Sequence, residues 1–179
     1  VREGVKEDPV GMVSDSMTLV SFGAIAFLAA AVLDTIVAWV LKALYEKHPL
    51  TTLSTYFRLL HAAIMGIAVY ALVNTRGLSD ADAILTQVEI FDTMWLIGLF
   101  FFGVHLILLS KILKSVVPRW ISLSLFVAGT MYMLDTTLQF TFSNYDTYAD
   151  TFLALVAIPS ILGEMALSVW LLLKSSKTM

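Results

Sequence analysis

Five long apolar runs constrain the fold of this chain more than any other feature. They cover about residues 17–44, 51–74, 88–114, 119–142 and 149–173. Each run is near the roughly 20 residues that an α-helix needs to cross a hydrocarbon core about 30 Å thick. The runs are continuous rather than alternating with period two, which argues against a transmembrane β-barrel. The sequence therefore predicts an all-α protein, an integral membrane helical bundle with five transmembrane helices.

Composition excludes the soluble alternatives. Apolar residues make up 59% of the 179 positions and charged residues only 14%, whereas a soluble domain carries roughly 25% charged residues. A net charge of −3 provides no basic surface for DNA or RNA. The absence of cysteine excludes disulfides, thiolate metal ligands and cysteine nucleophiles. No serine-hydrolase motif occurs either, so these features favour a non-enzymatic protein over an enzyme.

The polar breaks between the runs carry helix signals. Pro118 lies where the fourth helix would begin, because its missing N–H costs nothing in a first turn. Residues 74–77 predict the end of the second helix, and residues 78–87 predict a surface loop with a helix cap and room for a short interfacial helix. No linker separates a second domain. We expect a single transmembrane helical domain, residues 1–179, with a short polar N-terminal segment, residues 1–15.

Basic residues outside the spans are shared unevenly between the two sides of the membrane. Seven fall on one side: Lys42, Lys47, Lys111, Lys114, Arg119, Lys174 and Lys177. Three fall on the other side: Arg2, Lys6 and Arg76. Because cytoplasmic loops carry the excess of Lys and Arg, the C-terminus should be cytoplasmic and the N-terminus outside. A five-span chain with its N-terminus outside needs a signal to place it there, so we also expect a helix upstream of Val1.

Ionisable residues within the spans are the strongest pointer to function. Each costs about 2.5–3.5 kcal/mol on insertion scales, so each needs a physical reason. With a rise of 1.5 Å per residue, five polar residues on four spans fall about 10–15 Å from the inner end of their spans. This polar layer consists of Asp34, Arg58, His61, His105 and Glu164. A second layer, about 22 Å from the inner end, consists of Asp135, Tyr132 and Gln139.

Three interpretations of the polar layer stay open. In the structural one, Arg58 pairs with Asp34 or Glu164, and the network fixes the packing of the bundle. In the second, the layer binds a polar head group, an ion or a proton, and Glu164 or His61 changes its protonation state. In the third, His61 and His105 ligate a metal or haem. No metal-ligand spacing surrounds either histidine, so we expect no metal and no cofactor, and these two residues are only weak candidates.

Several segments also resemble a known family. The most specific are Phe102-Gly103-Val104-His105, Pro118-Arg119-Trp120 and Gly163-Glu164. They resemble the uncharacterised prokaryotic membrane-protein family catalogued as domain of unknown function 4386, over roughly residues 14–174. Members usually read as six helices, so the resemblance implies that the family's first helix is absent here. One departure is Ser110-Lys111, where the family more often has a glycine and an aromatic residue. The resemblance implies no activity, substrate or cofactor.

These features favour an accessory or structural subunit, or a small binding module, of a larger membrane complex. One alternative is a small proton- or ion-coupled transporter or sensor that uses the buried arginine, histidine and glutamate. A second alternative is a haem- or metal-binding redox protein of the membrane. The expected partners are the lipid bilayer and other membrane subunits or a second copy of the chain, and not nucleic acid. The expected location is the cytoplasmic membrane of a prokaryotic cell.

Overall fold

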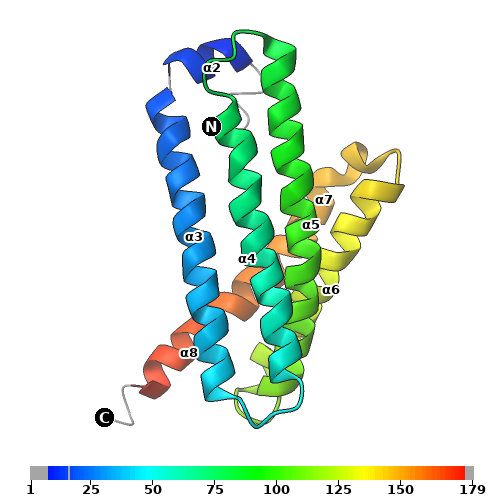
Figure 1. Cartoon of the computed structure of the whole chain (residues 1–179). Coiled ribbons are helices and arrows are strands. Elements are labelled where there is room, and N and C mark those ends of the chain that lie inside the picture. Colours follow the sequence, from blue (N-terminus) through cyan, green and yellow to red (C-terminus); the bar gives the residue numbers. More distant parts are fainter. Residues whose placement is uncertain (1–7, 16, 176–179) are drawn as a thin grey trace. The chain divides into compact units, whose positions relative to one another are not determined.

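The computed structural model describes residues 8–15 and 17–175, and every regular element in that part of the chain is a helix (Figure 1). The α-helices are α2 (Pro9–Asp15), α3 (Met17–Leu44), α4 (Thr51–Asn74), α5 (Ala81–Leu113), α6 (Arg119–Thr141), α7 (Ala149–Ser160) and α8 (Ala166–Ser175). A 3-10 turn, η1 (Tyr145–Tyr148), precedes α7, and a π-helical turn, η2 (Ile161–Met165), joins α7 to α8.

Five helical segments are long and apolar enough to cross a membrane. They are Met17–Leu44, Thr51–Asn74, Ala81–Leu113, Arg119–Thr141 and Thr151–Lys174. The last of these combines α7, η2 and α8 into one span. The predicted all-α membrane bundle with five spans is therefore confirmed.

The third span begins earlier than the sequence predicts, at Ala81 rather than near residue 88. The Asp80 carboxylate accepts a hydrogen bond from the backbone N–H of Ala83 at 3.0 Å, which caps the first turn. Ile84 is fully buried and packs with Val88 in a small apolar cluster. The helix cap that the sequence predicts within residues 78–87 is therefore present at Asp80, but the loop ends there and the helix that follows is continuous with the third span.

Part of the predicted polar N-terminal segment is also helical. The Asp8 carboxylate accepts a hydrogen bond from the Gly11 N–H at 3.0 Å, and Pro9 starts α2, where its missing N–H costs nothing. Val13 on α2 is 2% exposed and packs with Ile84 and Val88 of α5. Residues 1–7 of that segment lie outside the described part of the chain.

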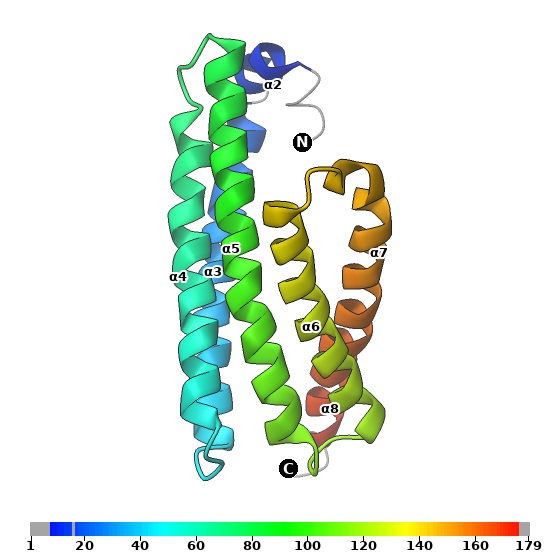
Figure 2. The same cartoon turned by 90° about the vertical axis from the view of Figure 1, so that its right-hand side faces the viewer.

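The chain divides into two compact units. Unit 1 comprises residues 1–37 and 59–98, and unit 2 comprises residues 38–58 and 99–179. The helices α3, α4 and α5 therefore each contribute residues to both units. Within unit 1, their segments run side by side (Figure 1). Within unit 2, α6 and α7 form an antiparallel hairpin (Figure 2). The single domain expected from the sequence stays a prediction.

Each unit has an apolar core of its own. In unit 1, Phe91 is buried against Ala68 and Ala71, and the rings of Phe27 and Trp95 lie 5.2 Å and 5.8 Å from that of Phe91. In unit 2, the core contains the almost fully buried side chains Leu106, Leu113, Ile121 and Leu125.

Glycines permit close helix approach in unit 2. A Cβ added to Gly129 on α6 would lie 2.5 Å from the Gly103 carbonyl oxygen on α5. A Cβ added to Gly163 in η2 would lie 3.0 Å from the backbone nitrogen of Leu125 on α6. Both contacts involve backbone atoms, so the two helix pairs pack at these points only because side chains are absent.

Candidate functional site

His105 of α5 is the centre of a buried polar cluster in unit 2. Its side chain is 1% exposed, and its Nδ1 lies 2.9 Å from the hydroxyl and 3.0 Å from the carbonyl oxygen of Ser54 on α4. Its Nε2 lies 3.2 Å from Nη1 of Arg58. The guanidinium carbon of Arg58 also lies 5.3 Å from the centroid of the Phe102 ring, a cation–π distance.

This arrangement assigns the proton on His105. Arginine only donates hydrogen bonds, so Nε2 must accept from Arg58, and Nδ1 must carry the proton that it donates to Ser54. The hydrogen-bond network thus selects one neutral tautomer. Both ring nitrogens are already engaged, so His105 would have to break one of these hydrogen bonds before it could bind a metal or haem.

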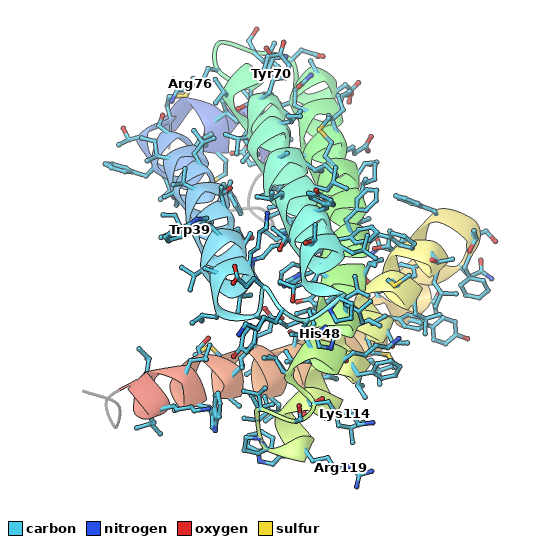
Figure 3. The ribbon with its side chains drawn as sticks, turned by 60° about the horizontal axis from the view of Figure 1, so that its bottom comes forward. Trp39, His48, Tyr70, Arg76, Lys114 and Arg119 are labelled. Atoms are coloured by element: carbon cyan, nitrogen blue, oxygen red, sulfur yellow. The ribbon has the colours of Figure 1, made fainter. Side chains whose placement is uncertain are left out.

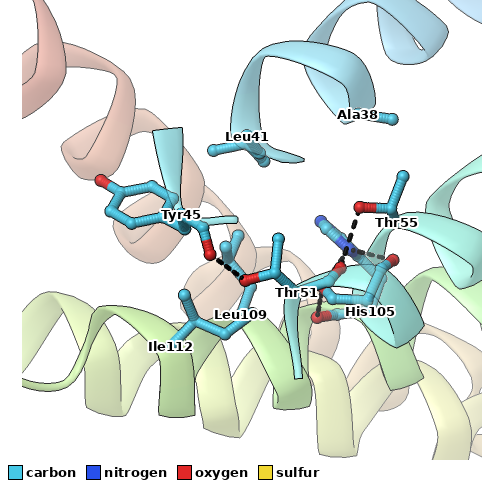
Figure 4. Close-up of a pocket in the computed structure, with 9 residues that line it drawn as sticks. Ala38, Leu41, Tyr45, Thr51, Thr55, His105, Leu109 and Ile112 are labelled. Carbon is cyan, nitrogen blue, oxygen red and sulfur yellow. Dashed lines mark hydrogen bonds between the residues drawn. The ribbon is translucent and has the colours of Figure 1, made fainter. Parts of the chain in front are cut away.

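A very small cavity lies beside this cluster (Figure 4). Its volume is about 10 Å³, which is room for about one water molecule. The Thr51 hydroxyl donates to the Tyr45 carbonyl at 2.7 Å, and the Thr55 hydroxyl donates to the Thr51 carbonyl at 2.9 Å. Burial raises the pKa of the Tyr45 phenol. The hydroxyls of the wall are satisfied locally, and the cavity is too small for a substrate.

Glu164 belongs to a second polar cluster of unit 2, at the π-helical turn η2. The hydroxyl of Tyr132 on α6 forms side-chain hydrogen bonds with Ser160 and Glu164. Pro159 lies two residues before the π-helical turn. The sequence assigns Tyr132 and Glu164 to different layers, whereas the structure brings the two side chains together.

The rest of the predicted second layer forms a third cluster, near the end of α6. The Gln139 amide donates to Asp135 at 3.4 Å and to the hydroxyl of Tyr145 at 3.2 Å. The Tyr145 hydroxyl in turn donates to Asp135. Sequence reasoning missed Tyr145 because it lies in η1, outside the apolar runs.

Asp34 and His61 form a pair in unit 1 in which the histidine is buried and the aspartate is partly exposed. The Asp34 carboxylate lies 3.3 Å from Nε2 of His61, and the His61 side chain is 8% exposed. Gly98 of α5 packs against the same ring, since a Cβ there would lie 3.3 Å from Nδ1 of His61. The five residues of the predicted polar layer thus divide between the units, with Asp34 and His61 in unit 1 and the others in unit 2.

A cavity in unit 1 has a volume of about 300 Å³. Its wall is almost entirely apolar, and Thr75 and Asp92 are the two polar residues among those that line it; the lining residues are Val13, Leu19, Val20, Gly23, Phe27, Leu72, Thr75, Val88, Phe91 and Asp92. Sequence reasoning misses the cavity because it does not recognise α2, which contributes Val13 to the wall.

Within residues 8–15 and 17–175, no group of three or more histidine, aspartate or glutamate side chains could hold a metal ion. The clusters around His105, Glu164 and Asp34 are instead pairs and triads held by hydrogen bonds from serine, tyrosine, arginine or histidine. Such networks can fix helix packing, and they can also exchange protons.

A known protein family matches nearly the whole chain. The family described as "Domain of unknown function (DUF4386)" matches residues 2–175. An uncharacterised protein of the archaeon Archaeoglobus fulgidus is 27% identical over 130 residues, a match that covers 72% of this chain and 67% of the archaeal protein. No solved structure matches. A helix upstream of Val1 stays a prediction. With nearly the whole chain matched, this five-span protein belongs to the DUF4386 family.

Proposed function

We propose that this protein is a membrane-embedded binding protein for a small amphiphile, a largely apolar molecule that carries one cationic group. The cavity of about 300 Å³ in unit 1 is the observation that carries the proposal. Ligand sites have volumes of about 300–1,000 Å³ and apolar walls with a few polar groups. This cavity fits that description, since its wall is apolar except for Thr75 and Asp92.

The wall also indicates the ligand class. An engineered apolar cavity of about 150 Å³ binds benzene, so twice that volume suits a ligand of about ten to fifteen non-hydrogen atoms. A half-buried carboxylate in an apolar wall favours a cationic partner over an anionic one. Arylalkylamines combine that size with that charge, so they are suitable probes.

Gly23 provides the sharpest test. It lines the cavity, and a Cβ added there meets no heavy atom within 4 Å. Gly23→Phe should therefore place its ring in the cavity and lower the affinity for the ligand at least about tenfold. Gly66→Phe is the matched control, because Gly66 also has open space around it but does not line the cavity.

The assay is fluorine NMR on the protein in lipid nanodiscs, with 4-fluorophenethylamine as the probe. Saturable binding is expected for the wild type and for Gly66→Phe, and loss of binding for Gly23→Phe. The anion 4-fluorophenylpropionate should bind more weakly than the amine, and Asp92→Asn should remove that preference. Equal binding of the amine by the wild type and by Gly23→Phe would overturn the proposal.

A second candidate function is a small proton- or ion-coupled transporter or sensor. It is favoured by the position of Glu164 in a π-helical turn, because such turns are frequent at functional sites. The test is proton flux into liposomes, followed with an internal pH-sensitive dye. Glu164→Gln should abolish the flux while the protein stays folded. An unchanged flux per folded molecule in that variant, with lower thermal stability, would support the structural interpretation instead.

We also propose that the basic end of unit 2 faces the cytoplasm. The loops between α3 and α4 and between α5 and α6 lie at the same end of that unit (Figure 2), and Lys47, Lys114 and Arg119 lie in or beside them. The sequence has no cysteine, so labelling of a single introduced cysteine shows on which side of the membrane that residue lies. An impermeant maleimide should label Ser79→Cys in intact cells, and Ser115→Cys only after lysis. The reverse result would invert the topology.

A role as a subunit of a larger membrane complex, with other chains or a second copy as partner, stays a prediction. It is tested by purification in a mild detergent. A stable protein that purifies alone as a monomer would count against it.

A further inference from the structure

We propose that Lys111, Lys114 and Arg119 form a binding site for the phosphate of an anionic phospholipid. The three side chains line a pocket of about 240 Å³ in unit 2, together with the apolar side chains of Leu123 and Phe126. Figure 3 shows Lys114 and Arg119 at the neighbouring ends of α5 and α6. The proposal concerns a site separate from the cavity in unit 1 and does not depend on what that cavity binds.

Among the described residues, no acidic side chain compensates the charge of the pocket. All three basic side chains are exposed, and no acidic residue lines the pocket. Among the described residues, the structure gives none of the three an ion pair. Lys174, another basic residue of unit 2, differs because its ammonium lies 4.7 Å from the centroid of the Trp170 ring. Three uncompensated cations around one pocket favour an anionic ligand.

The two serines of the pocket, Ser110 and Ser122, have no hydroxyl proton left to donate to an anion. The Ser122 hydroxyl donates to the Ser110 carbonyl at 2.8 Å, and the Ser110 hydroxyl donates to the Ile107 carbonyl at 2.8 Å. Both hydroxyl protons are already donated to backbone carbonyls of α5. The donors left for an anion are those of the lysines and the arginine, which are well suited to phosphate oxygens.

The position of the pocket indicates a lipid rather than a soluble anion. Lys111 and Lys114 lie at the end of the third span, and Arg119 at the start of the fourth. Helix ends are where lipid head groups lie. Leu123 is 60% exposed and Phe126 is 43% exposed, and both follow Arg119 into the span. A phosphodiester bound by the basic residues can therefore lay its acyl chains along these two apolar side chains.

The experiment is native mass spectrometry of the full protein, purified with equimolar phosphatidylglycerol and phosphatidylcholine. The wild type should retain phosphatidylglycerol in clear preference. One basic residue near the surface is worth about fivefold in anionic lipid affinity. Lys111→Gln/Lys114→Gln should therefore lower phosphatidylglycerol affinity about 25-fold and leave phosphatidylcholine binding unchanged. Because all changed side chains are exposed, the variant should fold, which circular dichroism checks.

The matched control is Lys42→Gln/Lys47→Gln, which removes the same charge from exposed positions of unit 2 outside the pocket. It should keep the wild-type lipid preference. Equal losses in both double variants would show a general charge effect and overturn the proposed site. Excess inorganic phosphate tests whether the pocket binds a soluble anion instead of a lipid. If it displaces phosphatidylglycerol, the pocket binds free phosphate and the lipid assignment is overturned; if it does not, the assignment is supported.

Discussion

The contact between Gly103 and Gly129 makes a quantitative prediction about the packing of α5 on α6. Gly129→Ala would place a Cβ 2.5 Å from the Gly103 carbonyl oxygen, 2.9 Å from Cγ1 of Ile107 and 3.0 Å from the Ile107 nitrogen. Two of these three atoms belong to the backbone, so no side-chain rotation relieves the overlap. Restoring an ordinary separation of about 3.5 Å requires the helices to move apart by about 1 Å.

The expected loss of stability follows from that displacement. Overpacking of a well-packed interface costs about 1–3 kcal/mol, and a gap of 0.5–1 Å forfeits about a quarter to a half of the attraction at the surrounding contacts. A higher helix propensity of alanine returns about 0.5–1 kcal/mol. Because the obstacle is backbone, the cost belongs in the upper half of its range, and the free energy of unfolding should fall by about 2 kcal/mol.

Unfolding by sodium dodecyl sulfate in lipid bicelles, followed by tryptophan fluorescence, measures this change. Gly66→Ala is the control, because a Cβ there meets no heavy atom within 4 Å and the gain in helix propensity should leave that variant as stable as the wild type or slightly more stable. The reasoning would be refuted by Gly129→Ala unfolding at the wild-type detergent concentration, or by equal losses in the two variants.

Three further predictions concern the polar groups of unit 2. Arg58→Ala removes the hydrogen bond to His105 and the cation–π contact with Phe102, so the free energy of unfolding should fall by about 2–3 kcal/mol. The control, Lys42→Ala at an exposed position, should change it by less than about 0.5 kcal/mol. Equal stabilities of the two variants in the same unfolding assay would contradict this. Ser54→Ala removes one buried hydrogen-bonding hydroxyl and should cost about 0.6–1.7 kcal/mol; no measurable loss would show that the hydroxyl does not stabilise the cluster. Burial raises the pKa of Tyr45, so the folded state holds the phenol proton more tightly than the unfolded state. The stability should therefore be unaffected below pH 10 and should fall as the pH rises above 10. Tyr45→Phe should flatten that part of the curve of stability against pH.

Hydropathy predicts the spans well because the membrane imposes one simple requirement on them. An apolar helix of about 20 residues satisfies its own backbone hydrogen bonds in lipid, so the five spans are readable without tertiary information. The start of α5 at Ala81 is harder to predict, because it depends on tertiary contacts. Residues 81–87 follow Ser79-Asp80, a pair that is typical of a loop or a helix cap. Their helical state depends on the cap at Asp80 and on the burial of Ile84 against α2, and both belong to the folded structure.

The pairing of the polar residues is less predictable than their existence. A uniform rise of 1.5 Å per residue assigns Tyr132 and Glu164 to different depths, but that calculation assumes straight α-helices parallel to the membrane normal. The π-helical turn η2 interrupts the last span at Glu164, after Pro159. The turn changes both the rise and the direction of the side chain, and the sequence pattern alone does not reveal it. The contact of Arg58 with His105, by contrast, joins two residues that the sequence does assign to one layer.

The glycines distinguish packing from ligand binding in this family member. Lipid tails are as apolar as helix surfaces, so helices associate in a membrane largely through close backbone contact at small residues. Gly103, Gly129 and Gly163 fit that role, since a Cβ at each would collide with the backbone of the facing helix. Gly23 does not fit it, because a Cβ there meets only open space in the wall of the cavity of about 300 Å³. Packing therefore gives no reason for glycine at position 23, and because this residue lines the cavity, Gly23→Phe tests the proposed function more directly than a change in any buried polar residue.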